Sequence, residues 1–134
     1  MKYGRPRTFM ALSLLYQGID WNGSNWHVDH IIPQADAQIN VLRGRNIPEH
    51  RVQEIVAALN SLGNLQLLRG DENIEKGAMP FRSWITGRCI DFHHQHMIPE
   101  RIDHCDVLWL PEFVREREKL IRKRILELVG RGAA

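Results

Sequence analysis

The chain has 134 residues, of which 43% are hydrophobic and 25% are charged, and its formal net charge is +2. These values are typical of one globular domain, and the small net charge neither requires nor excludes a nucleic-acid partner, because DNA contact needs only a local basic patch. We find no apolar run long enough to span a bilayer, no secretory signal and no disulfide framework between the two cysteines, so we expect a cytoplasmic protein.

The first half of the chain is predicted to contain two helices and one strand. Apolar side chains at helical spacing predict a helix over residues 6–16. A polar turn follows, and the segment WHVDH predicts a short strand over residues 26–30. Residues 34–47 are ambiguous, and a short helix within them is one interpretation. An amphipathic helix is predicted over residues 48–62, with Gly63 as its stop.

The second half is predicted to contain one strand and four helices. The segment NLQLL predicts a strand over residues 64–68, followed by a turn at Arg69 and Gly70. Asp71 suits the N-cap of a short helix over residues 72–77. Three further helices are predicted over residues 80–86, 91–97 and 112–129.

Three segments together carry a chemical signal that none carries alone: HVDHIIP (27–33), NLQLL (64–68) and DENIEKG (71–77). Phosphodiester hydrolysis needs a base, a cation at the phosphate and aligned attack. A strand that ends in Asp29 and His30 presents a carboxylate and an imidazole, and the following helix places Asn73 opposite them. The oxygens of Asp29 and Asn73 suit Mg²⁺ or Mn²⁺, and His30 can act as general base. Lys76 shares a helix face with Asn73 and is expected to contact the phosphate.

The DHIIP strand, the NLQLL strand and the N-x-x-K helix resemble the ββα-metal core of HNH nucleases. The match is to the variant with Asn at the final position, which the HNH domain of RNA-guided CRISPR effectors also has. This resemblance implies that Asp29 and Asn73 bind one divalent cation, Mg²⁺ or Mn²⁺, and that His30 is the general base. Asn64 matches the middle Asn, which in the family braces the loop between the strands.

A wider resemblance covers nearly the whole chain. The segments KYGRPRTFMALSLLY, NLQLLRGDENIEKGAMPFRSW and PEFVREREKLIRKRILELV are similar to the C-terminal part of modification-dependent restriction proteins of the GmrSD type. The implied fold is α+β, with a ββα-metal (HNH, or His-Me finger) core over about residues 26–77, a two-stranded antiparallel hairpin within it, and helical flanks over 1–25 and 78–134. The implied domain organisation is a single nuclease domain, 1–134, from the C-terminal part of a larger protein whose N-terminal nucleotide-hydrolysing domain is not in this sequence.

The function implied by the resemblance is that of a metal-dependent DNA endonuclease in bacterial defence against phage, often against DNA with modified cytosines. DNA is the expected partner, no membrane partner is expected, and dimerisation is left open. Three alternatives stay open: a free-standing HNH nicking enzyme or toxin, a DNA-binding module with a degraded site, and a structural helical domain with a chance motif. Cleavage by the isolated chain favours the first, loss of both cleavage and metal binding favours the second, and a wide separation of Asp29 from Asn73 favours the third.

A second group of potential metal ligands lies in the C-terminal half. Structural zinc is disfavoured there, because paired Cys-x-x-Cys knuckles are missing and the helical HHQH run does not direct its rings to one point. We instead expect polar side chains on a surface helix and two buried thiols. The group consists of Cys89, His93, His94, His96, His104 and Cys105.

Several other side chains have two possible roles. His27 shares a strand face with Asp29, so it is either a further metal or phosphate ligand or an ordinary strand histidine. Basic residues between 115 and 131 alternate with glutamates, which is typical of a solvated helix face. Trp26 and Trp84 are expected in the core. Part of the basic set could still follow a DNA backbone, together with Lys2, Arg5, Arg7, Arg43 and Arg45.

Overall fold

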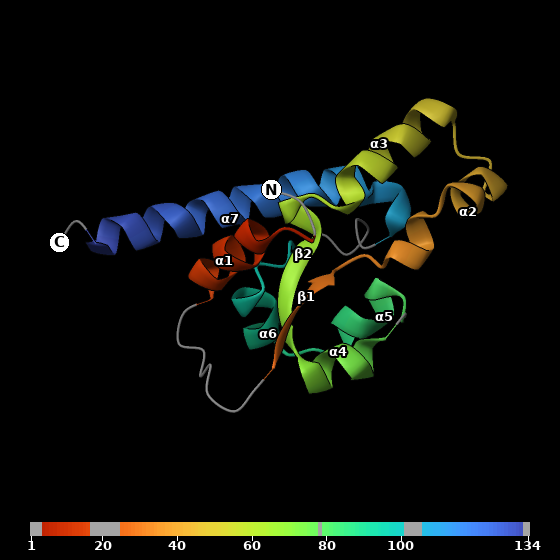
Figure 1. Cartoon of the computed structure of the whole chain (residues 1–134). Helices are drawn as coiled ribbons and strands as arrows, with labels where there is room; N and C mark the ends of the chain where they lie inside the picture. The colour runs from red at the N-terminus through yellow and green to blue at the C-terminus, as the bar shows by residue number, and fades with distance from the viewer. Residues whose placement is uncertain (1–3, 17–24, 78, 101–105, 133–134) are drawn as a thin grey trace.

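The computed structural model describes residues 4–16, 25–77, 79–100 and 106–132 and has an α+β fold. Strand β1 (Trp26–His30) pairs with β2 (Leu65–Arg69) in an antiparallel hairpin (Figure 1). The register places His27 opposite Leu68 and Asp29 opposite Gln66. The predicted hairpin is therefore confirmed, with β2 beginning one residue later than predicted.

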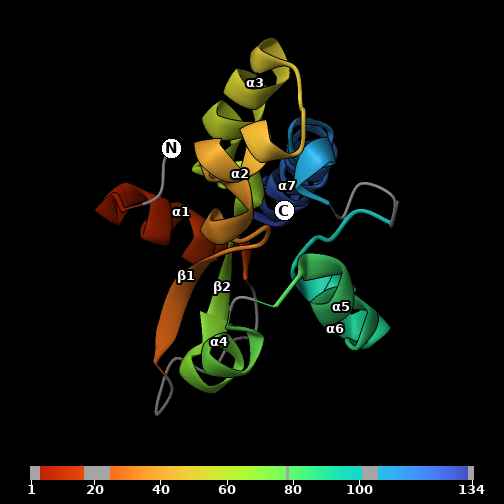
Figure 2. The same ribbon diagram turned by 90° about the vertical axis from the view of Figure 1, so that its right-hand side faces the viewer.

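Helices surround the hairpin on several sides. Their bounds are α1 (Pro6–Leu15), α2 (Ile39–Gly44), α3 (Glu49–Leu59), α4 (Gly70–Lys76), α5 (Phe81–Thr86), α6 (Ile90–Gln95) and α7 (Leu110–Gly132), with short 3-10 turns η1 (Gln34–Ala37), η2 (Leu62–Asn64) and η4 (Val107–Trp109). In Figures 1 and 2, α7 runs along one side of the molecule with α1 beside it, and α4 lies at the opposite end of the hairpin. None of the helices in the part of the chain described is long and apolar enough to cross a membrane.

Strand β2 lies between two apolar clusters, which explains why it contains so few polar residues. Leu65 and Leu67 pack with residues of α1 and α7, including Leu12 and Ile121. Leu68 instead joins a larger cluster that contains side chains of α3, α5 and the start of α7. Apolar burial of this kind contributes about 25 cal/mol per Å², so the packing on both faces fixes the register of the hairpin.

The predicted core tryptophans are found where expected. Trp84 is buried in the larger cluster, and Trp26 packs partly buried against the smaller one. The ambiguous segment 34–47 forms the short turn η1 and the helix α2, rather than one continuous element.

Two predicted helix boundaries are wrong. Helix α3 ends at Leu59, so Gly63 is not its stop and lies instead in η2. A Cβ at Gly63 would stand 2.7 Å from Val114 Cγ1 and 2.9 Å from the Val114 backbone oxygen, so only glycine lets η2 approach α7 this closely. Gly63 is therefore needed for packing and does not cap a helix.

Helix α4 also begins earlier than predicted. It starts at Gly70, so the expected turn there and the expected N-cap at Asp71 are both wrong. The N-cap is Arg69, whose backbone N–H donates to Glu72 Oε1 at 3.3 Å. This is one half of a capping box, and it gives the backbone N–H of the N-cap residue a hydrogen-bond partner.

Helix α7 departs from the predicted solvated basic face at Arg117. That side chain is 0% exposed, and its guanidinium donates to the carbonyl oxygens of Leu62, Gly63, Leu65 and His96 at 2.6–3.2 Å. Burial lowers its pKa to about 10. Arg117 thus holds η2 and the start of β2 against α7. Further along the helix Ile125 is 46% exposed. The C-terminal end of α7 extends beyond the other elements (Figure 1).

His96, predicted on a helix surface, is also buried. The hydroxyl of Tyr16 accepts from the Leu67 N–H at 3.2 Å and lies 2.9 Å from His96 Nδ1. Burial, followed by the charges of Arg117 and Arg124, lowers the pKa of His96 to about 3. The imidazole is therefore neutral in the folded chain.

The depressed pKa of His96 predicts a pH-dependent stability. A histidine takes up a proton near pH 6.5 when unfolded and only near pH 3 when folded, so its contribution is complete above about 6.5 and is lost as the pH falls towards 3. The expected slope is about 1.4 kcal/mol per pH unit. Urea unfolding at several pH values should show this slope reduced in His96→Gln and unchanged in His94→Gln, an exposed control. Equal slopes in both variants would contradict the assignment.

Candidate active site

The Asp29 carboxylate lies near the end of β1 and is held by two donors. Lys76 Nζ is 3.0 Å from Asp29 Oδ2, and Gln66 Nε2 donates to the same oxygen at 2.9 Å. The Asp29 side chain is 12% exposed. The Gln66 partner is the residue directly opposite in the hairpin. One carboxylate oxygen is therefore fixed from the neighbouring strand and from α4.

Lys76, expected to share a helix face with Asn73, is buried. Its side chain is 1% exposed, and its ammonium donates to the His30 backbone oxygen at 2.9 Å as well as contacting Asp29. A buried ammonium must be compensated by such partners. The ammonium thus points into the protein and holds the end of β1, and the expected contact of Lys76 with a phosphate stays a prediction.

Asn73 lies on the face of α4 that is turned towards the hairpin. One turn earlier is Gly70, which lies close to His27: a Cβ added at Gly70 would be 3.5 Å from His27 Nε2. One turn later is Lys76, which contacts Asp29. Residues three apart share a helix face, so Asn73 is placed between these two contacts. Its side chain is half-buried, and His27 is exposed. Positions 27, 29 and 73 therefore face the same side of the hairpin.

His30 occupies the last position of β1 and turns towards the end of α3. Its ring is 7% exposed, and Nε2 lies 2.7 Å from Asn60 Oδ1. Burial lowers the pKa of His30 below the usual 6.5, and the charge of Asp29 acts in the opposite direction. The pKa falls because desolvation disfavours the charged imidazolium. The neutral ring is the form that can accept a proton at neutral pH.

Asn64 braces the loop that follows β1. It is 0% exposed, and its amide bonds the backbone N–H of Ile32 at 2.9 Å, the Ile32 oxygen at 3.2 Å and the Leu59 oxygen at 2.9 Å. Its own backbone oxygen accepts from the Ile31 N–H at 2.8 Å. These contacts match a structural role and leave no surface of Asn64 for a substrate.

The donor set around Asp29 fits a hydrated divalent cation. Among the residues that the structure describes, no three His, Cys, Asp or Glu side chains form a group that could hold a metal ion. One carboxylate and one amide are too few for zinc, which takes three or four protein ligands. Mg²⁺ keeps several of its waters and needs only one or two carboxylates. Asp29 and Asn73 supply oxygen donors of that kind, and their assignment to one ion stays a prediction.

The second cluster of histidines and cysteines has other uses. His96 is buried against Tyr16, and His93 Nε2 lies 3.1 Å from the Ile85 backbone oxygen. Cys89 is exposed, so the prediction of a buried thiol is wrong at this position. His104 and Cys105 lie outside the described residues.

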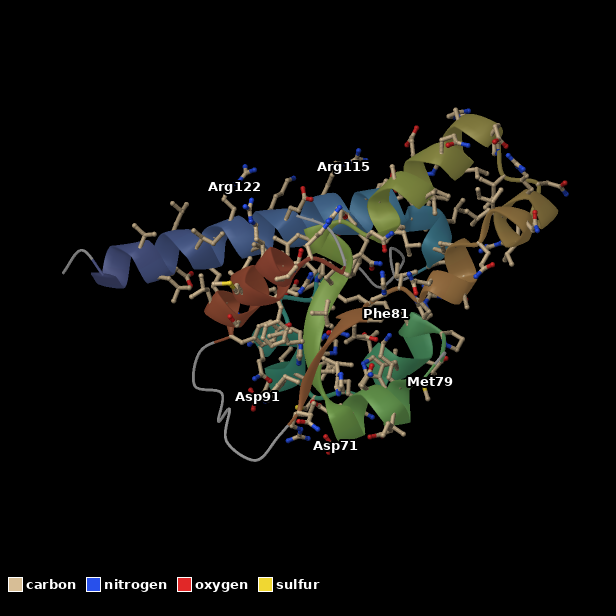
Figure 3. All side chains as sticks on the ribbon, in the orientation of Figure 1. Asp71, Met79, Phe81, Asp91, Arg115 and Arg122 are labelled. Atoms are coloured by element: carbon tan, nitrogen blue, oxygen red, sulfur yellow. The ribbon has the colours of Figure 1, made fainter. Side chains whose placement is uncertain are left out.

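The basic residues considered for DNA contact lie in different parts of the molecule, and Arg5 lines a pocket together with His27. Arg43 pairs with Glu49 at 2.8 Å, and Arg45 pairs with Asp106 at 3.4 Å. Arg115 and Arg122 project from the side of α7 that faces away from the hairpin (Figure 3). Arg5 and Arg7 are exposed, and Lys2 lies outside the described residues.

Two residues of the site escaped prediction, Asn60 and Gln66. Asn60 follows α3 immediately and reads as an ordinary helix end. Gln66 lies inside an apolar strand, and its position opposite Asp29 follows only from the register. A buried polar residue within an apolar run is the one signal that could have marked Gln66.

The family model described as GmrSD restriction endonucleases, C-terminal domain, matches residues 7–124. No curated protein matches the chain.

Proposed function

Since this chain belongs to the family of GmrSD restriction endonuclease C-terminal domains, we propose that it is a metal-dependent DNA endonuclease with an HNH active site. The proposed ββα-metal core consists of β1, β2 and α4. The observation that carries the proposal is the Asp29 carboxylate, held through one oxygen by Lys76 and Gln66 beside His30. A carboxylate fixed in this way is oriented before any ligand arrives.

We assign the cation to Asp29 and Asn73. Oδ2 of Asp29 already has two donors, so Oδ1 is the oxygen assigned as ligand, together with the amide oxygen of Asn73. A bound Mg²⁺ or Mn²⁺ supplies positive charge at the scissile phosphate and at the departing oxygen. His27, on the same side of the hairpin, is the further candidate for contact with the ion or the phosphate.

The proposed general base is His30. Its burial and lowered pKa keep the imidazole neutral near pH 7, ready to take a proton from the attacking water. Attack in line with the 3′ oxygen then leaves 5′-phosphate and 3′-hydroxyl ends. Lys76 and Asn64 serve this reaction by holding the backbone at His30 and just after it.

The biological setting proposed here is bacterial restriction of phage DNA, including DNA with modified cytosines. The family's designation as a C-terminal domain supports a partner domain in a larger protein. A site with one metal ion contacts the DNA backbone rather than the bases. We therefore propose that the choice of substrate comes from surfaces or domains outside this core.

Plasmid cleavage tests the function directly. The wild-type chain should convert supercoiled plasmid to nicked or linear DNA in Mg²⁺ or Mn²⁺ and not in EDTA. Unmodified and cytosine-modified phage DNA should be compared side by side. Asp29→Ala should lower cleavage about 100-fold or more and weaken Mn²⁺ binding in calorimetry, because it removes the only charged ligand assigned. Asp91→Ala, exposed on α6 (Figure 3), is the control.

The outcomes separate the competing functions. A wild-type chain that neither cleaves DNA nor releases heat on metal titration contradicts the proposal and favours a DNA-binding module with a degraded site. Nicking of unmodified plasmid by the chain alone favours a free-standing nicking enzyme or toxin. Wild-type activity in Asp29→Ala would show that Asp29 is not a ligand of the catalytic cation.

A further inference from the structure

A second asparagine, Asn60, lies against the ring of the proposed base. It follows the last residue of α3, and its Oδ1 is 2.7 Å from His30 Nε2. We propose, resting on the proposed function, that Asn60 is a positioning residue that fixes both the orientation and the tautomer of His30. It does not contact the reacting atoms.

The chemistry of the two groups sets the tautomer. An amide oxygen only accepts hydrogen bonds, so Nε2 of His30 must carry the proton that it shares with Asn60. A neutral imidazole carries one ring proton, and Nδ1 therefore holds the lone pair. Nδ1 is then the atom that takes the proton from water. Loss of Asn60 removes the acceptor that favours this tautomer.

Asn60 is itself held in a rigid turn. Its backbone N–H donates to the Ala58 oxygen, and the Ser61 hydroxyl donates to that oxygen at 2.7 Å. Asn64 binds the Leu59 oxygen at 2.9 Å. The turn between α3 and η2 is thus fixed on both sides of Asn60, as a positioning residue requires.

His30 is consequently held at two points by different helices. Lys76 of α4 binds its backbone oxygen at 2.9 Å, and Asn60 at the end of α3 contacts its ring. The backbone contact sets where the residue lies, and the ring contact sets how the imidazole is turned. Both are needed to present one nitrogen to water, since catalytic geometry tolerates only small displacements.

The test combines kinetics with nitrogen NMR of the histidine rings. Asn60→Ala should lower kcat for cleavage about 10- to 100-fold, the usual effect of removing a group that orients a ligand or base, with KM for DNA unchanged. Its His30 signals, identified by their loss in His30→Ala, should change from the Nε2–H form to a mixture of tautomers above pH 6.5, the ordinary histidine pKa. Asn60→Asp keeps an acceptor at the same place and should keep the Nε2–H form.

Gln53→Ala is the matched control, because it removes an exposed hydrogen bond within α3 without touching His30 or the turn that holds Asn60. Wild-type kcat and an unchanged His30 spectrum in Asn60→Ala would overturn the inference, as would an Nδ1–H ring in the wild-type chain. A wild-type chain that cleaves no DNA would instead overturn the proposed function. The NMR comparison would then still decide the tautomer on its own.

Discussion

His30→Ala is expected to lower the rate of DNA cleavage by about 10³-fold, because general-base catalysis contributes roughly 10²–10⁴-fold to such reactions. The ring is buried and its pKa is lowered, so it is neutral where the reaction needs an acceptor. Asn60, which contacts the ring, is only half-buried and can bond to water when the ring is gone. We therefore expect a loss of stability of no more than about 2 kcal/mol, so the folded variant can be assayed.

Single-turnover cleavage of plasmid in Mg²⁺ measures this effect without interference from product release. His50→Ala is the control, since His50 is exposed on α3 and distant in sequence from the motif. A melting curve for each variant separates loss of the base from loss of the fold. Cleavage by His30→Ala at the wild-type rate would leave the site without its proposed base.

The elements of this fold could be predicted where the signal is local. The alternation in WHVDH and the apolar run in NLQLL located both strands to within one residue. Helical spacing located α1, α3, α5 and α6 to within a few residues. Each of these signals depends on neighbours close in sequence, whose spacing the backbone geometry dictates.

Contacts between distant segments could not be predicted in the same way. The alternation of Arg117 with glutamates is typical of a surface, yet its guanidinium meets carbonyls of η2 and β2 that lie more than fifty residues earlier. The sequence of α7 alone does not indicate that these carbonyl groups lie next to Arg117. Helix boundaries failed for a similar reason, since Gly63 is required by Val114 of another helix.

In the candidate site, too, local positions could be predicted and contacts between distant segments could not. The sequence pattern correctly put Asp29, Asn73 and His30 on β1 and α4, but it could not give the direction of each side chain. The spacing of Asn73 and Lys76 places both on one face of α4, and that face is turned to the hairpin, so the lysine is buried. The burial follows from tertiary packing alone.

Lys76→Met is expected to lower the free energy of unfolding by about 3 kcal/mol, because removing one partner of a buried ion pair leaves the other charge uncompensated. Asp29 would keep only Gln66 as a donor, and the His30 backbone oxygen would lose its partner. Methionine has nearly the same length as the aliphatic part of lysine, so the packing volume is preserved. Urea unfolding in EDTA measures the loss without any contribution from a bound cation.

The double variant Asp29→Asn with Lys76→Met decides between the two roles of the lysine. If Lys76 acts as a buried partner of Asp29, removing both charges should restore most of the lost stability, because a neutral pair leaves no charge in the interior. If Lys76 instead contacts a phosphate, Lys76→Met should melt like the wild-type chain and only raise KM for DNA. Lys119→Met, exposed on α7, controls for the loss of one positive charge. The buried ammonium at 3.0 Å from the carboxylate makes the first result the expected one.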